Sequence, residues 1–290
     1  MPVQEEKPGV YPWIVFLGVS RVANPTSIKD IVNWSTGAVV GPRHILTAAH
    51  VCKLLDKTRR KWDAGLGAGT CRLVCIPGFH GVFGANTKIY PIGADAYRVS
   101  KRSLFTHCSY TDLESYHNQI TRIVQQQNFF ANDIAMYFLG QDLPASIPRA
   151  LVRYADKGYL DPRRKRPLMA HGYPRDRQGR LMFASTHARK TFPAHFHLHD
   201  ALLGPAASGG PVWVRASPKP LILGTISGFK AFNVGAPLQG LEAGPKADNR
   251  APTKKTGKSS PLPKWVTTGV ASRLTRETYL EVRQWLRKRK

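Results

Sequence analysis

Residues 203–212 read LGPAASGGPV, a stretch in which one serine, Ser208, lies between small residues. Small neighbours leave a serine hydroxyl uncovered and let a substrate carbonyl approach the backbone N–H groups. The stretch therefore predicts a nucleophile turn. A plain turn between two strands is the alternative, because turns of small residues are common in all-β proteins. A base and an orienting carboxylate elsewhere in the chain would distinguish the two.

A candidate base is His50, which ends the segment TAAH at 47–50 and follows the strand-like Ile45 and Leu46. Histidine has the side-chain pKa best suited to proton transfer near neutral pH. We expect His50 to leave a buried strand just before a short segment, residues 51–55. A purely structural histidine is the alternative, since the chain contains ten.

A candidate carboxylate is Asp133, at the entry to the apolar run IAMYFL at 134–139. There it can be buried and can accept a hydrogen bond from an imidazole N–H, although an aspartate beside a strand is more usually a turn former. His50, Asp133 and Ser208 follow one another in the order His, Asp, Ser, each in the local setting that its role requires. The three together predict a nucleophilic triad.

These segments, with a helical pattern at the C-terminus, resemble the chymotrypsin-like serine proteases over most of residues 10–290. Looser motifs at 76–81, 91–93, 97–99 and 171–174 are similar to the V8/glutamyl-endopeptidase branch. The resemblance implies an all-β fold of two packed antiparallel six-stranded barrels with the active site between them, and a C-terminal α-helix. It also implies a monomeric, secreted or extracytoplasmic enzyme that acts on protein or peptide substrates without a cofactor.

The pattern of short apolar runs agrees with this fold class. Runs bounded by Gly, Pro, Asn and Asp predict strands at 13–19, 36–40, 43–47, 134–139, 168–171, 212–214, 221–226 and 266–270. We expect one domain over 1–290, with one barrel at about 10–145, a second at about 146–272, and a helix at 274–290 capped by Thr275. A flexible insertion is expected at 230–264, and a weaker helical pattern covers 113–127.

The resemblance also assigns roles. Ser208 would be the nucleophile, His50 the general base and then acid, and Asp133 the group that fixes the imidazole tautomer. The N–H groups of Ala206 and Ser208 would form the oxyanion hole, and Ser227 and Gly228 would lie on the strand that aligns the substrate.

The expected substrate pocket is apolar. Leu202 and Leu203 would floor it, which predicts an apolar or small P1 residue. A pocket loop shifted by one or two residues would bring in Asp200 instead. Ile226 stands where glutamyl endopeptidases place a histidine, so cleavage after Glu is not expected.

The chain departs from the family pattern in front of Ser208. Alanine at position 206 replaces glycine, and the conformation that the first oxyanion N–H needs costs an alanine about 1 kcal/mol. Ala207 replaces the usual acid and no Ile-Val-Gly-Gly start is present, which excludes trypsin-type activation by an internal ion pair. Cys52 has no cysteine partner near Ser35 or Thr36, so the common histidine-loop disulfide is absent.

Composition and charge leave a second function open. The 290 residues are 42% hydrophobic, enough for a sizeable core, and carry a net charge of +25. Such a field attracts polyanions such as nucleic acid or anionic glycans. The alternative function is therefore a weakly active or inactive protease-fold protein that binds polyanions, whereas a solvated basic surface would need no partner. No run is long enough to span a bilayer. The first residues do not read as a leader, so either the chain is not exported by the classical route or a leader has been removed.

Two sets of residues raise the question of metal binding. Cys71 and Cys75 are close to a zinc-ligand spacing, yet no second close pair follows; with Cys52 and Cys108 they are equally compatible with disulfides or free thiols. His195, His197 and His199 alternate along a strand-like segment, so they share one face. That face predicts either a metal site or, as we favour, a polar strand face near the cleft, and no metal is expected.

Overall fold

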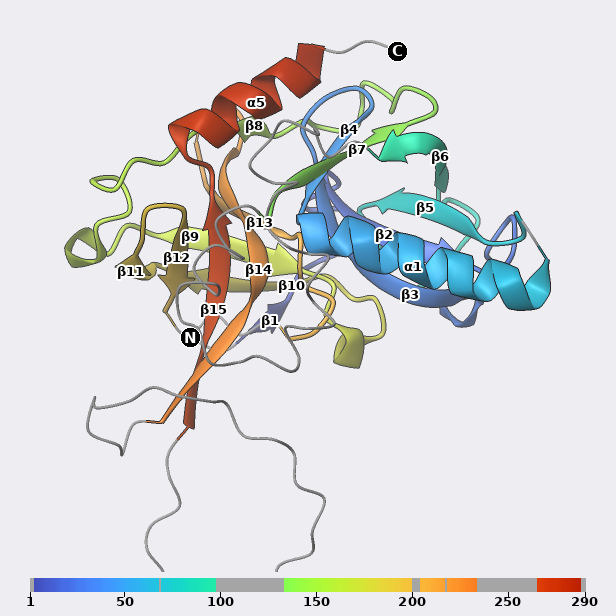
Figure 1. Cartoon of the computed structure of the whole chain (residues 1–290), viewed down its shortest axis with the longest axis horizontal. Coiled ribbons are helices and arrows are strands. Elements are labelled where there is room, and N and C mark those ends of the chain that lie inside the picture. The colour runs from blue at the N-terminus through green and yellow to red at the C-terminus, as the bar shows by residue number, and fades with distance from the viewer. Residues whose placement is uncertain are drawn as a thin grey trace, which may run out of the picture.

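Two β-units and a C-terminal helix make up the part of the chain that the structure describes. The structure is a computed structural model, and it describes residues 3–67, 69–97, 133–199, 204–216, 218–233 and 265–287. The N-terminal β-unit and the C-terminal β-unit lie side by side (Figure 1).

The N-terminal unit is a closed barrel of six antiparallel strands in the order β2-β3-β4-β7-β6-β5. Their bounds are β2 Ile14–Ser20, β3 Ile31–Val39, β4 His44–Thr47, β5 Arg72–Pro77, β6 Tyr90–Tyr97 and β7 Ala135–Leu139. Strand β2, with the sequence IVFLGVS, is buried along its whole length because it pairs with β3 and β5 and also contacts helix α1. A one-turn 3₁₀ helix, η1 at Ile28–Asp30, leads into β3.

The C-terminal unit is a curled sheet with the strand order β1-β10-β9-β13-β14-β15-β12-β11, and β8 pairs in parallel with β14. The bounds are β1 Gln4–Glu5, β8 Leu151–Val152, β9 Leu168–Gly172, β10 Met182–Thr186, β11 Ala188–Thr191, β12 His195–Leu198, β13 Pro211–Val214, β14 Leu221–Asn233 and β15 Trp265–Arg273. Short 3₁₀ helices, η3 at Pro162–Arg164 and η4 at Arg175–Arg177, lie in its connections. The predicted all-β class is confirmed, as a closed six-stranded barrel beside a curled half-barrel sheet.

Helix α5, Arg276–Arg287, confirms the predicted C-terminal helix. The Thr275 hydroxyl accepts a hydrogen bond from the Thr278 amide at 3.2 Å, as expected of a cap. Val282 and Trp285 are buried against the barrel core. No helix in the described part of the chain is long and apolar enough to cross a membrane.

Helix α1, Ala49–Leu66, was not predicted: only a short segment at 51–55 was expected there. Its buried residues are Val51, Cys52 and Leu55, all within the first two turns. The rest of the helix has no repeating pattern of apolar residues from which a helix could be predicted. Ion pairs stabilise the exposed part instead, with Arg60 and Asp56 at 2.7 Å and Arg59 and Asp63 at 3.1 Å.

Two other predicted segments lie partly or wholly outside the residues that the structure describes. The insertion expected at 230–264 begins as strand, since β14 continues to Asn233, and residues 234–264 lie outside the described part. The helical pattern at 113–127 also lies outside it.

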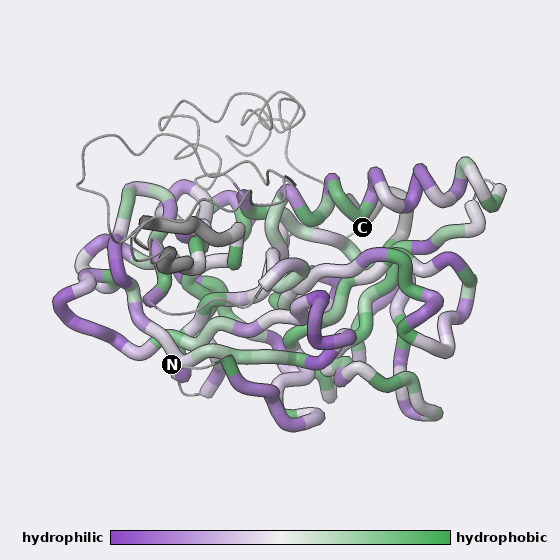
Figure 2. The backbone as a smooth tube through the Cα atoms, turned by 90° about the horizontal axis from the view of Figure 1, so that it is seen from below, coloured by the Kyte–Doolittle hydropathy of each residue, from purple (hydrophilic) through white to green (hydrophobic). Residues whose placement is uncertain are grey.

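The buried hydrophobic residues form two cores, of which the larger extends from the barrel into the sheet and the smaller lies within the sheet. Trp13 of the N-terminal segment packs edge to face on Trp213 of β13, with ring centroids 5.3 Å apart. Figure 2 shows hydrophobic residues along the inner strands and hydrophilic residues at the outer turns. The two β-units are therefore held together by buried aromatic packing as well as by the chain.

A buried polar chain ties the N-terminal segment to this core. The Trp213 indole N–H donates to His171 Nδ1 at 3.1 Å, and His171 Nε2 lies 3.3 Å from the carboxylate of Glu6. Because the indole only donates, Nδ1 must be unprotonated, so Nε2 carries the hydrogen and donates to Glu6. Burial lowers the pKa of His171 below its ordinary value, and the bond from His171 lowers the pKa of Glu6.

These shifts predict a loss of stability in acid. As the pH falls below about 6.5, an unfolded histidine takes up a proton that buried His171 resists, so the free energy of unfolding drops. His171 should account for up to about 1 kcal/mol of that drop between about pH 6.5 and 5.5. Glu6 adds a loss at lower pH, because its stabilising carboxylate form disappears as the pH falls through its lowered pKa.

Urea denaturation across this pH range measures the effect, with the His171→Gln variant as the control that cannot titrate. The wild type should lose more stability than the variant on acidification. Parallel curves for the two proteins would contradict the assignment.

Candidate active site

His50 lies in the first turn of α1, directly after the buried strand β4. Strand β4 ends at Thr47, Ala48 is the N-cap of α1 with an extended backbone, and no side chain of Ala48 caps the helix. The imidazole is partly exposed, with 13% of the side chain accessible to solvent. The helix start thus holds His50 at the edge of the barrel, where α1 begins beside β13 and β14 (Figure 1).

Asp133 lies at the entry to β7, the strand that pairs with β4. Thr47 faces Ala135 across that ladder, which brings Asp133 to the start of α1. One carboxylate oxygen accepts a hydrogen bond from the His50 amide at 2.8 Å, and the other lies 2.7 Å from His50 Nδ1. The carboxylate therefore caps the otherwise uncapped helix and binds the imidazole at the same time.

This pair fixes the chemistry that His50 offers. An ionised carboxylate only accepts hydrogen bonds, so Nδ1 of His50 carries a hydrogen, and in the neutral imidazole Nε2 is then the acceptor. Asp133 is only 3% exposed, and the Thr225 hydroxyl donates to its backbone carbonyl at 3.3 Å. A neutral imidazole held in this tautomer is suited to accept a proton from a hydroxyl group.

The Ser208 turn packs against strand β3 of the barrel. The Ser208 carbonyl accepts hydrogen bonds from the Ser35 hydroxyl at 2.7 Å and the Thr36 amide at 3.1 Å. The Thr36 hydroxyl donates to the Ala206 carbonyl at 3.1 Å and accepts from the Tyr173 amide at 2.9 Å. Two strand residues of the barrel thus hold the turn on both sides of its serine.

Gly209 shows how closely the turn approaches the strand that leads to His50. Its φ is +80°, and a Cβ there would lie 2.1 Å from the Thr47 hydroxyl and 3.1 Å from the Ala48 amide. Only glycine fits such a contact. The structure therefore brings the predicted Ser208 to the same junction as the predicted His50 and Asp133.

The residues in front of Ser208 form a tight turn. The Ala207 amide donates to the Gly204 carbonyl at 3.4 Å, Pro205 occupies the second position, and Ala206, in the third, has a φ of +70°. These are the features of a type II turn, whose third position favours glycine. An alanine in this left-handed region costs about 1 kcal/mol, as the sequence led us to expect.

The predicted substrate strand has an open edge beside the turn. Strand β13 pairs with β14 as far as Thr225, and Ile226 then exchanges backbone hydrogen bonds with Gly209 and Gly210 at 2.7 and 2.8 Å. Beyond Ile226, the described part of β14 pairs with β15 only. The Ser227 hydroxyl lies 2.6 Å from the Ser272 hydroxyl on β15, and Ser227 is only 5% exposed.

Several predicted site residues are not placed. Leu202, Leu203 and Asp200, the candidates for the substrate pocket, lie outside the residues that the structure describes, as does Cys108. The described cysteines, Cys52, Cys71 and Cys75, are buried free thiols.

His195, in β12, and His199, directly after it, are engaged in ring contacts. His195 stacks on Phe192 with centroids 4.4 Å apart, and His199 stacks on His187 at 4.5 Å. Over the described ranges, no three His, Cys, Asp or Glu side chains are grouped so as to hold a metal ion.

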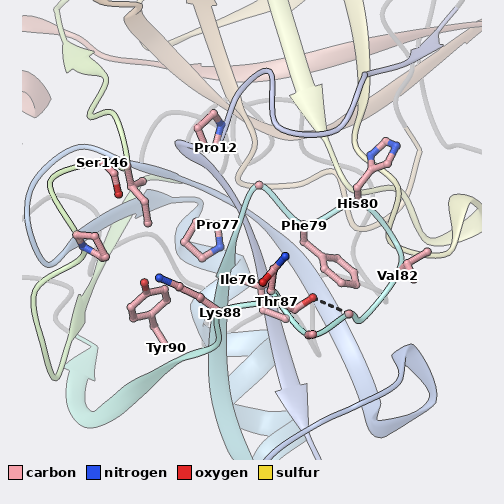
Figure 3. Close-up of a pocket in the computed structure, with 16 residues that line it drawn as sticks. Pro12, Ile76, Pro77, Phe79, His80, Val82, Thr87, Lys88, Tyr90 and Ser146 are labelled. Carbon is pink, nitrogen blue, oxygen red and sulfur yellow. Dashed lines mark hydrogen bonds between the residues drawn. The ribbon is translucent and has the colours of Figure 1, made fainter.

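A separate cavity of about 460 Å³ lies on the far end of the barrel from these residues. Pro12, the end of β5, the loop that follows it and Ser146 line it, and His80 and Lys88 stand at its rim (Figure 3). Neither His50, Asp133 nor Ser208 contributes to it, so it is not part of the candidate active site.

No protein-family model and no curated protein matches the chain. Solved structures do. A Glu endopeptidase in complex with MPD matches with a TM-score of 0.57 and 12% identity over 99% of this chain and 97% of its own. The VesB protease of Vibrio cholerae matches with a TM-score of 0.50 and 15% identity over 98% of this chain and 65% of its own. The chain therefore has the chymotrypsin-like serine protease fold, with a Glu endopeptidase among its structural neighbours.

Thr36 should prove essential to the shape of the Ser208 turn. The Thr36→Val variant keeps the size of the side chain but leaves the Ala206 carbonyl and the Tyr173 amide without their hydroxyl partner. We expect it to lower the free energy of unfolding by about 1–3 kcal/mol, because buried polar groups without partners carry a penalty of that size.

Urea denaturation measures this loss. Thr36→Ser is the matched control, since it keeps the hydroxyl and removes only a methyl group, worth about 1 kcal/mol. A Thr36→Val variant as stable as the wild type would show that the hydroxyl contacts contribute nothing.

Proposed function

We propose that the chain is a serine endopeptidase that hydrolyses peptide bonds through an acyl-enzyme. The observation that carries the proposal is the buried Asp133 carboxylate, which binds the amide and Nδ1 of His50 at the junction against which the Ser208 turn packs. The fold shared with known proteases supports it.

In the proposed reaction, His50 Nε2 takes the hydroxyl proton of Ser208 as the serine oxygen attacks the scissile carbonyl. The carbonyl oxygen becomes an oxyanion that the amides of Ala206 and Ser208 would stabilise. His50 then gives the proton to the leaving amine, and the C–N bond breaks to leave the acyl group on Ser208. Water, deprotonated by His50, hydrolyses that ester and restores the serine.

The proposed substrate is a protein or peptide in extended form. Its backbone would pair with the open edge of β14 at Ser227 and Gly228, as in β-augmentation. For P1 we propose an apolar or small residue, with Leu202 and Leu203 at the floor of the pocket. Ile226 is 7% exposed and apolar, so it cannot bind a glutamate carboxylate. By the same resemblance we propose a secreted monomer that needs no cofactor.

The Ser208→Ala variant tests the proposal. It should fold normally and lower the rate of peptide hydrolysis by roughly 10⁴-fold or more, because the nucleophile and its base act as one unit. A fluorophosphonate probe should label the wild type at Ser208 and leave the variant unlabelled. Melting temperatures of both proteins serve as the folding control.

A peptide library digested by the wild type reads the specificity in the same experiment. Cleavage should concentrate after apolar or small residues. A folded wild type that neither takes up the probe nor cleaves any peptide would refute the proposed activity, and cleavage after Glu would refute only the proposed pocket.

A second candidate function is binding of linear polyanions. The observation that favours it is a basic patch, which we define as Arg163, Arg164, Lys165 and Lys190. All four residues are exposed, and η3 and β11, which carry three of them, are in contact. The Thr191 hydroxyl donates to the Leu160 carbonyl at 2.6 Å and holds the two segments together. Closely spaced cations of this kind suit the repeated charges of a polyanion.

Elution from heparin and from DNA columns tests this second function. The double variant Arg163→Glu/Arg164→Glu should elute at clearly lower salt than the wild type, because phosphate and sulfate contacts weaken steeply with salt. The variant Arg276→Glu/Arg283→Glu, on α5, changes the net charge equally and is the control. Equal shifts for both variants would show that only net charge acts, and would exclude the basic patch as a site.

A further inference from the structure

The turn at residues 204–207 has two conformations open to it. In the observed type II form, Ala206 has a positive φ of 70°. A half-turn of the peptide between Pro205 and Ala206 would give a type I turn, in which the third residue has a φ of about −90°. Alanine prefers that second form, so the residue at position 206 works against the observed one.

One hydrogen bond favours the observed form. The Arg175 amide, in the first residue of η4, donates to the Pro205 carbonyl at 2.8 Å. This carbonyl belongs to the peptide that rotates between the two turn types. In a type I turn it would point the opposite way, and the bond would be lost.

The same bond determines where the Ala206 N–H points. In a trans peptide the carbonyl and the following N–H point in opposite directions. A carbonyl held by Arg175 therefore directs the Ala206 N–H away from Arg175, and no backbone carbonyl in the described part of the chain accepts from it. The flipped peptide would present a carbonyl oxygen in place of the N–H, and an oxyanion would be repelled there.

The donor is itself held by the N-terminal barrel. The Arg175 guanidinium donates to the side chain of Asn33 and lies over the Trp34 ring, 5.6 Å from its centroid. Asn33 in turn donates to the Thr58 hydroxyl on α1 at 3.0 Å. The Arg175 amide is therefore fixed relative to the helix whose first turn carries His50.

We propose that Arg175 is a positioning residue: its backbone amide selects the type II form of the 204–207 turn and so keeps the Ala206 N–H available to an oxyanion. The effect of Arg175 on catalysis rests on the proposed protease function. The selection of the turn type by Arg175 is independent of that function and can be tested on its own.

Arg175→Pro is the decisive variant, because it removes the amide donor. Pro174 has an extended ψ of 148°, which suits a residue before proline, and position 175 begins a 3₁₀ helix, where proline is tolerated. Arg175→Ala is the matched control, since it loses the same guanidinium but keeps the amide. Crystal structures should show a positive φ at Ala206 in Arg175→Ala and a negative φ in Arg175→Pro.

Kinetics give the second readout. In Arg175→Pro, kcat should be at least roughly tenfold below that of Arg175→Ala, towards the loss of about 10²–10³ known for a missing oxyanion donor, with KM within about twofold. Adding Ala206→Gly should restore kcat to within about threefold of the Ala206→Gly single variant, because glycine adopts a positive φ freely. General damage to the fold would not be rescued by that glycine.

The outcomes separate the two proposals. A positive φ at Ala206 in Arg175→Pro, or equal kcat in the two Arg175 variants, would overturn the positioning role. A wild type without hydrolysis would refute the protease function, while the crystal structures would still decide the turn type. If Arg175→Pro does not fold, hydrogen exchange of the wild-type Arg175 amide decides instead: protection is expected, and exchange at the rate of a free amide would overturn the proposal.

Discussion

The geometry of the candidate site depends on the hydrogen bonds of Thr36. Its amide and its hydroxyl bind the carbonyls of Ser208 and Ala206, its hydroxyl also accepts from Tyr173, and its carbonyl accepts from the Thr47 hydroxyl at 2.8 Å. Thr36 is fully buried, so each of these groups needs a partner. One residue of the barrel thus connects the serine turn, the end of β9 and the strand that leads to His50.

Asp133 combines a structural and a chemical task. The start of α1 has no side-chain cap of its own, and the carboxylate supplies one by accepting from the His50 amide. The same carboxylate binds the imidazole, so the orientation of the base and the start of its helix are set together. A change that moves Asp133 would disturb both, and the Thr225 hydroxyl, which donates to the Asp133 backbone carbonyl, helps to hold the residue in place.

Side-chain signals in the sequence predicted the all-β class, the C-terminal helix and the residues that the structure gathers around the start of α1. Small residues around Ser208 and the apolar strand after Asp133 are local patterns, and local patterns can be read without a fold. Helix α1 was not predicted, because its exposed turns are stabilised by ion pairs rather than by an apolar stripe. The roles of Thr36 and Arg175 were not predicted, because hydrogen bonds of the main chain between distant segments require no particular residue type and so give no sequence pattern.

The three described cysteines have a consequence for how this protein can be handled. All are buried free thiols, and burial raises the pKa of each of them, so they hold their protons at neutral pH and react slowly with oxidants and alkylating reagents. The barrel that carries His50 and Asp133 is held by packing and hydrogen bonds, with no cross-link between these thiols. Reducing agents therefore find no disulfide to break between Cys52, Cys71 and Cys75.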